Sequence, residues 1–135
     1  MVISMSEKRI EALVDAIANL KGSTTNPDGN LYQIKNPTGI LSFSKPGRSE
    51  IDSEGRRVFK SWLAGYRAAC FDAEIKISGE SRAGIKTDDK LENFLRVMGI
   101  DQKLGQQQVV KFLRRALKDQ TIAVDTPLSY FREEK

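Results

Sequence analysis

Three carboxylates recur at a spacing that can support acid–base chemistry or metal binding. Glu7, Glu11 and Asp15 stand four residues apart, and on a helix this spacing places them on one face. The apolar residues of the same segment define the opposite side of an amphipathic helix. We therefore interpret the carboxylate face as solvated and assign it no catalytic residue.

The absence of histidine excludes several other kinds of chemistry. The sequence holds no histidine and a single cysteine, so it lacks Ser-His-Asp and Cys-His catalysis and the usual zinc ligand sets. Cys70 lies within an apolar stripe, which favours a small core side chain over a nucleophile or redox switch. We expect no metal and no cofactor.

The charge is mixed, with a mild basic excess. Lysine and arginine number 22 against 18 acidic residues, a net charge of +4. Basic residues gather at 56–60 and 111–118 without interleaved aromatics that we expect to be exposed, so we do not expect nucleic acid as the partner. No apolar run approaches the roughly 20 residues that a membrane span needs. No signal-peptide pattern opens the chain, and we expect neither a membrane partner nor a signal peptide.

Most of the secondary-structure elements that the sequence predicts are helices. Four segments carry apolar residues at helical spacing and close on a glycine or a basic turn. We expect helices at about 6–22, 58–78, 87–99 and 106–118.

The segment 58–78 differs from the others because it is apolar on two sides. Its broad stripe consists of Trp62, Leu63, Tyr66, Ala69, Cys70, Ala73 and Ile77. Its narrow stripe consists of Ala64, Ala68, Phe71 and Ile75. A helix that is apolar on two sides needs neighbours on two sides. We therefore predict that it is the buried central helix of the fold.

Strand signals are short and few. Two Asn-Pro-x-Gly turn signals are each followed by a β-prone run, at 31–34 and 40–43, and together they predict a small β lobe over about 29–44. A third run, 121–124, predicts a short strand. The chain shows no internal repeat, and its 135 residues match one domain, 1–135. The predicted class is mainly α, with an α+β character from the β lobe.

Four blocks of the sequence carry a resemblance to a known family. They lie at 16–22, 35–41, 58–68 and 76–79. Their order, a helix ending in glycine, an Asn-Pro-x-Gly turn, then a Phe-x-Ser-x-x-x-Gly-Tyr-x-Ala entry to a central helix, resembles the lysozyme-like (goose-lysozyme or lytic-transglycosylase) architecture. More narrowly, it is similar to short lysozyme-like proteins of bacteriophage and prophage structural regions.

The position of the catalytic acid departs from that family. In active relatives the first helix ends in Glu-Gly, and this Glu protonates the glycosidic oxygen. Here Lys21 precedes Gly22. An ammonium with an ordinary pKa of about 10.4 cannot serve as that acid, and it would repel the oxocarbenium-like transition state. The resemblance therefore implies a scaffold without its catalytic residue.

By resemblance, the residues lining a glycan groove would be Lys21, Tyr32 and Asn36. Each has a structural alternative. Lys21 would complement the dipole of a helix C-terminus, Tyr32 would be half-buried on the β lobe, and Asn36 would cap its own turn.

These observations favour a non-catalytic virion or prophage structural protein: a cement, neck, tail or baseplate component. The resemblance implies synthesis in the bacterial cytoplasm, incorporation into a virion, other virion proteins as partners and an oligomeric assembly, with peptidoglycan contact left open. One alternative is an active peptidoglycan glycan-strand cleaving enzyme that uses Asp28 or Glu50 as its acid. The other is a basic nucleic-acid-binding module, whose binding would weaken steeply with salt.

Overall fold

The computed structural model describes residues 5–22, 28–39, 50–51, 56–78 and 89–132. This part of the chain is mainly helical, which confirms the predicted class at that level. Its elements in chain order are α1 (Met5–Lys21), α2 (Asn30–Gln33), β1 (Glu50–Ile51), β2 (Arg57–Val58), α3 (Trp62–Ile77), α4 (Leu91–Val97), α5 (Lys103–Leu117) and the 3-10 helix η1 (Leu128–Arg132).

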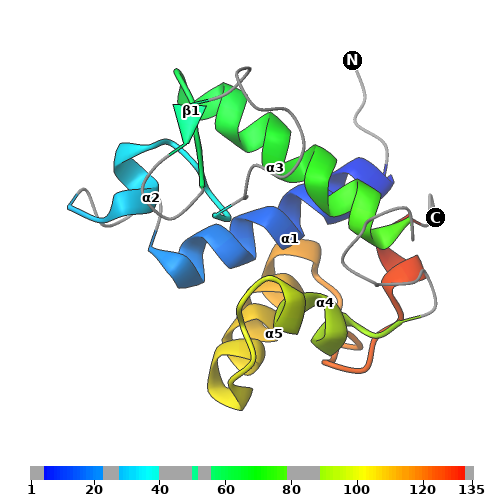
Figure 1. The fold of residues 1–135 in the computed structure, drawn as a ribbon. Coiled ribbons are helices and arrows are strands. Elements are labelled where there is room, and N and C mark those ends of the chain that lie inside the picture. The colour runs from blue at the N-terminus through cyan, green and yellow to red at the C-terminus, as the bar shows by residue number, and fades with distance from the viewer. Residues whose placement is uncertain (1–4, 23–27, 40–49, 52–55, 79–88, 133–135) are drawn as a thin grey trace.

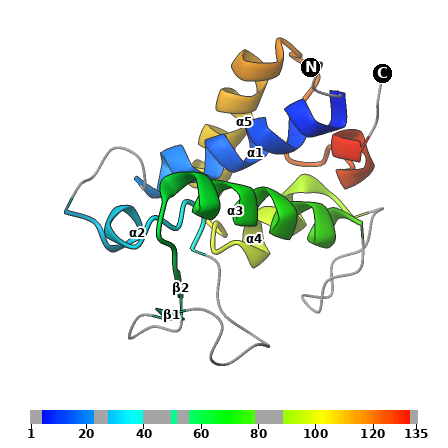
Figure 2. The same ribbon diagram turned by 90° about the horizontal axis from the view of Figure 1, so that it is seen from above.

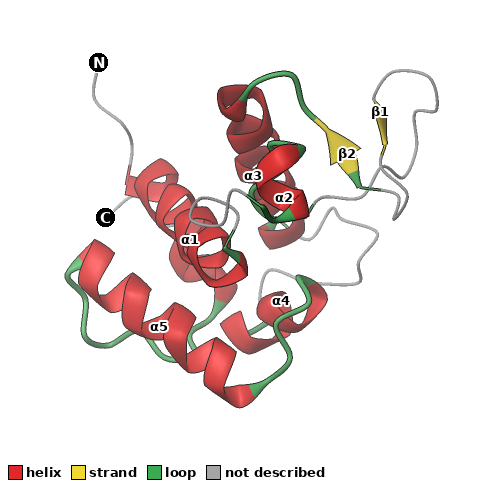
Figure 3. Cartoon of the chain, turned by 90° about the vertical axis from the view of Figure 1, so that its left-hand side faces the viewer, coloured by secondary structure: helices red, strands yellow, loops and turns green. Residues whose placement is uncertain are grey.

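The central helix of the fold is α1. It contacts α3, α5 and η1, and Figures 1 and 3 show it lying between α3 and α5. Its buried apolar residues are Ile10, Ala12, Leu13, Val14, Ala16, Ile17 and Ala18. The prediction that the segment 58–78 is the central helix is therefore wrong. Helix α1 itself buries seven apolar residues, whereas α3 buries four small or branched positions along one side.

Helix α3 begins four residues later than predicted because Ser61 caps it. The Ser61 hydroxyl accepts a hydrogen bond of 3.1 Å from the amide of Ala64, as an N-cap side chain does. The buried side of α3 consists of Gly65, Ala69, Ala73 and Ile77, all from the broad stripe or beside it. On the narrow stripe, Phe71 is 63% exposed. Within the described chain, α3 therefore has neighbours on one side, not on two.

The predicted β lobe is also wrong where the structure describes it. Residues 30–33 form the short helix α2, with the amide of Ile34 bonded to the carbonyl of Asn30. The only described strands, β1 and β2, form an antiparallel pair in which Glu50 faces Val58, and Figure 2 shows the pair to one side of the helices. The β-prone run 40–43 lies outside the described residues.

The C-terminal half closes the core beneath α1. Its fully buried side chains are Leu91, Phe94, Leu95, Leu113, Ile122, Leu128 and Phe131. The predicted strand at 121–124 is absent: the amide of Ala123 bonds the hydroxyl of Thr126 at 2.8 Å, a local turn in place of a partner strand. Arg114 fixes the same turn, because its Nε donates to the carbonyl of Ile122 at 2.7 Å. The helix predicted at about 87–99 is α4 (Leu91–Val97), and the first residues of the predicted range lie outside the described part.

Candidate functional site: a pocket beside Asp15 and the brace at Lys21

Lys21 ends α1 and ties it to two distant segments. Its ammonium donates hydrogen bonds of 3.0 Å to the carbonyl of Thr38 and 2.7 Å to the carbonyl of Met98. Met98 follows α4, so three parts of the chain meet at one nitrogen. The side chain is largely buried, and both acceptors are backbone atoms. Lys21 is thus an internal brace at the position where the resemblance places the catalytic acid.

The surroundings of Lys21 disfavour its positive charge. Burial, with the charges of Arg56 and Lys76, lowers the pKa of Lys21 to about 8. Desolvation and like charges both act in this direction. A neutral amine keeps two N–H groups, which is enough for both carbonyls. The brace can therefore persist after deprotonation.

Asn36 is a structural residue of the turn that follows α2. It is 0% exposed, and its amide oxygen accepts from the backbone N–H of Gly39 at 3.0 Å. Its amide nitrogen donates to the carbonyl of Arg57 at 2.9 Å. The predicted self-capped turn is confirmed, and the second bond also fastens the turn to β2.

Tyr32 lies on α2 and is exposed, 41% by area. It is thus on a helix rather than half-buried on a β lobe. Neither Tyr32 nor Lys21 nor Asn36 lines either of the two pockets described below. The three groove candidates are therefore not brought together around a described cavity.

A pocket that sequence reasoning missed lies where α1 meets α3 and α5. Its volume is about 220 Å³, and it is lined by Asp15, Ala18, Asn19, Trp62, Tyr66 and Phe112. The carboxylate and amide come from the last two turns of α1. The aromatic rings come from the first turns of α3 and from the middle of α5. We call this cavity the Asp15 pocket.

The Asp15 pocket is unfavourable for further negative charge. Burial raises the pKa of Asp15, although a hydrogen bond from Tyr66 offsets part of this effect. Burial and the charge of Asp15 likewise raise the pKa of Tyr66. The Tyr66 hydroxyl also lies 3.5 Å from the carbonyl oxygen of Glu11, at the outer limit of a hydrogen bond. The lining residues include no lysine or arginine.

The carboxylate face therefore differs from the sequence interpretation. Glu7 and Asp15 are exposed as expected, whereas Glu11 is half-buried. Asp15 in addition lines a cavity. The spacing of the three residues was correct, but it could not show that Trp62 and Phe112 would pack beside the third one. The only sequence feature that pointed to this pocket is the single tryptophan, Trp62, in the segment that forms α3.

Cys70, one turn after Tyr66, is half-buried. Burial and the carboxylates of Glu11 and Asp15 raise the pKa of its thiol to about 11. A thiol of this kind is protonated at neutral pH and therefore a poor nucleophile. The prediction of a packing role for Cys70 is consistent with its place at the edge of the core.

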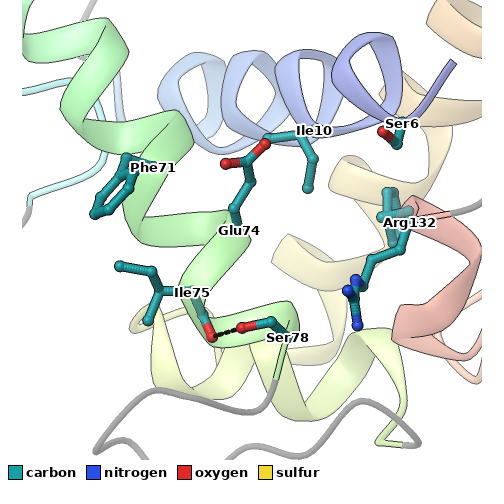
Figure 4. Close-up of a pocket in the computed structure, with 8 residues that line it drawn as sticks. Ser6, Ile10, Phe71, Glu74, Ile75, Ser78 and Arg132 are labelled. Atoms are coloured by element: carbon teal, nitrogen blue, oxygen red, sulfur yellow. Dashed lines mark hydrogen bonds between the residues drawn. The ribbon is translucent and has the colours of Figure 1, made fainter. Parts of the chain in front are cut away.

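A larger cavity of about 490 Å³ lies between α1, α3 and η1. Figure 4 shows Phe71 and Ile75 at one end and Ser6 and Arg132 at the other, with the Ser78 hydroxyl bonded to the Ile75 carbonyl at 2.8 Å. Its charged lining residues are Glu74 and Arg132, one of each sign. Ser78 and Arg132 are followed directly by residues outside the described part, so we base no function on this cavity.

The basic residues do not form a uniform surface. On α5, Arg114 is half-buried and bonded to the backbone of Ile122, while Lys111 and Arg115 are exposed. Near β2, the guanidinium of Arg57 lies over the ring of Phe59, 4.9 Å from its centre. Two of the basic side chains are thus engaged within the chain.

Comparison with known proteins adds no assignment. The chain matches no family model, no curated protein and no solved structure. Among the described residues, no three His, Cys, Asp or Glu side chains gather as a metal site would require. The helices of that part are also too short or too polar for any of them to cross a bilayer.

Proposed function

We propose that this protein is a non-catalytic structural component of a bacteriophage or prophage particle, built on a lysozyme-like scaffold. In this role it serves as a cement, neck, tail or baseplate subunit. Its partners are other virion proteins, with glycan contact as a further property of the same scaffold. The proposal rests on the resemblance of the sequence blocks and on the chemistry of Lys21.

The observation that carries the proposal is the double hydrogen bond of Lys21. At the position of the family's acid, the side chain donates to the carbonyls of Thr38 and Met98. Two of its three N–H groups are taken by backbone carbonyls, and Lys21 lines neither described pocket, so the side chain serves the fold rather than a substrate groove. This favours a scaffold retained for its shape over one retained for its chemistry.

The exposed side of α3 supports a role in assembly. Phe71 and Leu63 are 63% and 56% exposed, and Phe71 belongs to the narrow stripe that suggested a second neighbour for this helix. Large exposed apolar side chains on one helix are typical of surfaces that a partner covers. In the proposed role, that partner is another subunit of the particle.

The alternative, a glycan-strand cleaving enzyme, is favoured by one observation. Asp15 is a carboxyl with a raised pKa beside aromatic rings, as a general acid requires. The two acids expected from sequence receive no such support: Asp28 is exposed, and the side chain of Glu50 lies outside what the structure describes. The small volume of the Asp15 pocket, below the about 300 Å³ of typical ligand sites, counts against a strand-binding groove.

Quantitative mass spectrometry of purified particles tests the proposed role. Particles from the phage or lysogen that encodes the chain should contain it at a constant ratio to the major structural proteins. The matched control is a protein of similar size and abundance from the same lysate. If the chain stays in the soluble fraction while particles form normally without it, the proposal fails.

A further inference from the structure

We propose that the Asp15 pocket binds a methylated organic ammonium group, such as the trimethylammonium headgroup of choline or of a trimethylated lysine. The inference goes beyond the structural role proposed above and does not depend on it. It follows from the three kinds of group that α1, α3 and α5 bring to one small cavity: aromatic rings, a carboxylate and an amide.

The aromatic side of the cavity suits a cation. Trp62, Tyr66 and Phe112 come from two different helices and line the same space. The faces of aromatic rings carry negative potential, and several rings around one cavity are the usual way in which proteins hold quaternary ammonium groups. The three side chains are each only half-buried, so their remaining surface is open to a ligand.

The charge of the residues that line the cavity also favours a cation. Asp15 is the only lining residue that ionises readily, and no basic side chain lines the pocket to neutralise it. Asp15 is exposed along part of its side chain, and the protein that surrounds the rest raises the pKa of its carboxyl. A cation held against the rings would pair with this carboxylate and stabilise its charged form.

The number of acceptors favours a methylated ammonium over a primary one. A primary ammonium carries three N–H donors that must all be satisfied. The side-chain acceptors of the lining are the carboxylate of Asp15 and the hydroxyl of Tyr66, which already interact with each other, and the amide oxygen of Asn19. A trimethylammonium group needs no acceptor, and its methyl groups pack against the rings and Ala18.

The size of the cavity limits the ligand to one headgroup. Its volume of about 220 Å³ is below the roughly 300–1,000 Å³ of sites that hold drug-sized ligands. The rest of the molecule that bears the ammonium must therefore remain outside. Such a ligand is either a small free compound or the tip of a longer one, and the two sources share the same headgroup chemistry.

Fluorescence of the single tryptophan provides a direct assay. Trp62 lines the pocket and is the only tryptophan of the chain, so a change in its emission reports on this site. We would titrate the intact protein with choline and, separately, with its uncharged isostere 3,3-dimethylbutanol at constant ionic strength. The proposal expects a saturable change with choline and at least about tenfold weaker binding of the isostere.

Two variants and one control test whether choline binds in the Asp15 pocket. Asp15→Asn and Phe112→Leu should each weaken choline binding at least about fivefold, whereas Asp28→Asn, at an exposed carboxylate, should leave it unchanged. Circular dichroism verifies that each variant is folded. Because the two substitutions affect different helices, failure of one to fold leaves the other as the test.

Further titrations identify the kind of molecule that carries the ammonium group and test a competing class of ligand. Comparing choline with an Nε-trimethyl-lysine amide distinguishes a free compound from a protein side chain, and tighter binding of either agrees with the proposal. N-acetylglucosamine is the neutral competitor. The proposal is overturned if choline gives no saturable change, if its isostere binds equally well, or if only the sugar binds.

Discussion

The ammonium nitrogen of Lys21 lies 2.7 Å from the carbonyl oxygen of Met98, 77 residues further along the chain. The same nitrogen lies 3.0 Å from the carbonyl oxygen of Thr38. One side chain therefore joins the end of α1, the turn after α2 and the end of α4. This junction explains how a lysine at the end of α1 contributes to the fold.

Removing the brace should lower stability. We expect Lys21→Met to reduce the free energy of unfolding by about 2 kcal/mol, because two largely buried carbonyls lose their donor. Lys21→Glu should cost more, since it places a carboxylate against both carbonyl oxygens. Urea unfolding followed by circular dichroism measures the change. Lys8→Met, an exposed position on the same helix, is the control and should stay within about 0.5 kcal/mol of wild type.

The lowered pKa of Lys21 predicts a specific pH dependence. The folded value is about 8 against an ordinary value of 10.5, so between these pH values the unfolded chain binds more protons than the folded one. The free energy of unfolding should therefore rise with pH across this window. The unfavourable contribution is fully present below pH 8 and is lost above pH 10.5, a gain of up to about 3 kcal/mol.

The comparison of wild type with Lys21→Met isolates this effect, because methionine does not titrate and other groups cancel. Unfolding free energies of the two proteins, measured in urea across the same window, should diverge in favour of wild type. A difference that stays constant with pH would show that Lys21 titrates normally. The ¹³C resonance of its Cε atom gives the midpoint independently.

Gly65 is the closest approach between α3 and the turn after α2. A Cβ atom placed there would lie 1.8 Å from the carbonyl oxygen of Lys35, and Lys35 itself has a left-handed φ of 56°. We expect Gly65→Ala to destabilise the protein by at least about 3 kcal/mol, the upper range for overpacking. The turn cannot retreat without breaking the bonds of Asn36.

Thermal unfolding measures the effect, with Gly105→Ala as the matched control. A Cβ atom at Gly105 would lie 3.2 Å from the Cγ2 atom of Ile100, a contact that a small side-chain shift relieves. This variant also gains helix propensity within α5, so it should remain within about 1 kcal/mol of wild type. Equal stability of the two alanine variants would contradict the close approach at Gly65.

A polar substitution on the exposed face of α3 should weaken association without weakening folding. Phe71→Ser should reduce self-association or co-assembly, measured by sedimentation equilibrium, and should change the free energy of unfolding by less than about 0.5 kcal/mol. Leu104→Ser is the control, since Leu104 is 69% exposed on α5 and outside this face. If both variants associate like wild type, α3 does not form the contact.

Local patterns predicted the long helices well. The periodicity around Ile10 and Ile17 placed α1 within a residue at each end, and the pattern around Val109 and Leu113 found α5 three residues late at its start. In these segments the buried face, the capping preferences and the length all agree with one structure. Such agreement across levels is what makes a pattern reliable.

Short apolar runs were less informative. The β-prone run at 31–34 lies largely in a single helical turn because its last two amides bond to the carbonyls of Gly29 and Asn30 just before it, which no period over four residues can reveal. The run at 121–124 buries Ile122, but no strand of the described residues pairs with it. Propensity was overridden in both places by the nearest available hydrogen-bond partner.

The candidate site depended on contacts far apart in sequence. The partners of Lys21 lie 17 and 77 residues away, and the Asp15 pocket needs rings from α3 and α5. No local spacing encodes such distances. The apolar surface of α3 was visible as two stripes, yet the sequence could not distinguish a neighbour within the chain from one outside it.

Release of soluble muropeptides from purified peptidoglycan is the most direct measurement of whether this scaffold is catalytic. The wild-type protein should release none under conditions in which an active lysozyme digests the same substrate. It should also be folded in the assay, as verified by circular dichroism. Release above the no-enzyme control, abolished by Asp15→Asn in a folded variant, would contradict the non-catalytic account and make Asp15 the acid.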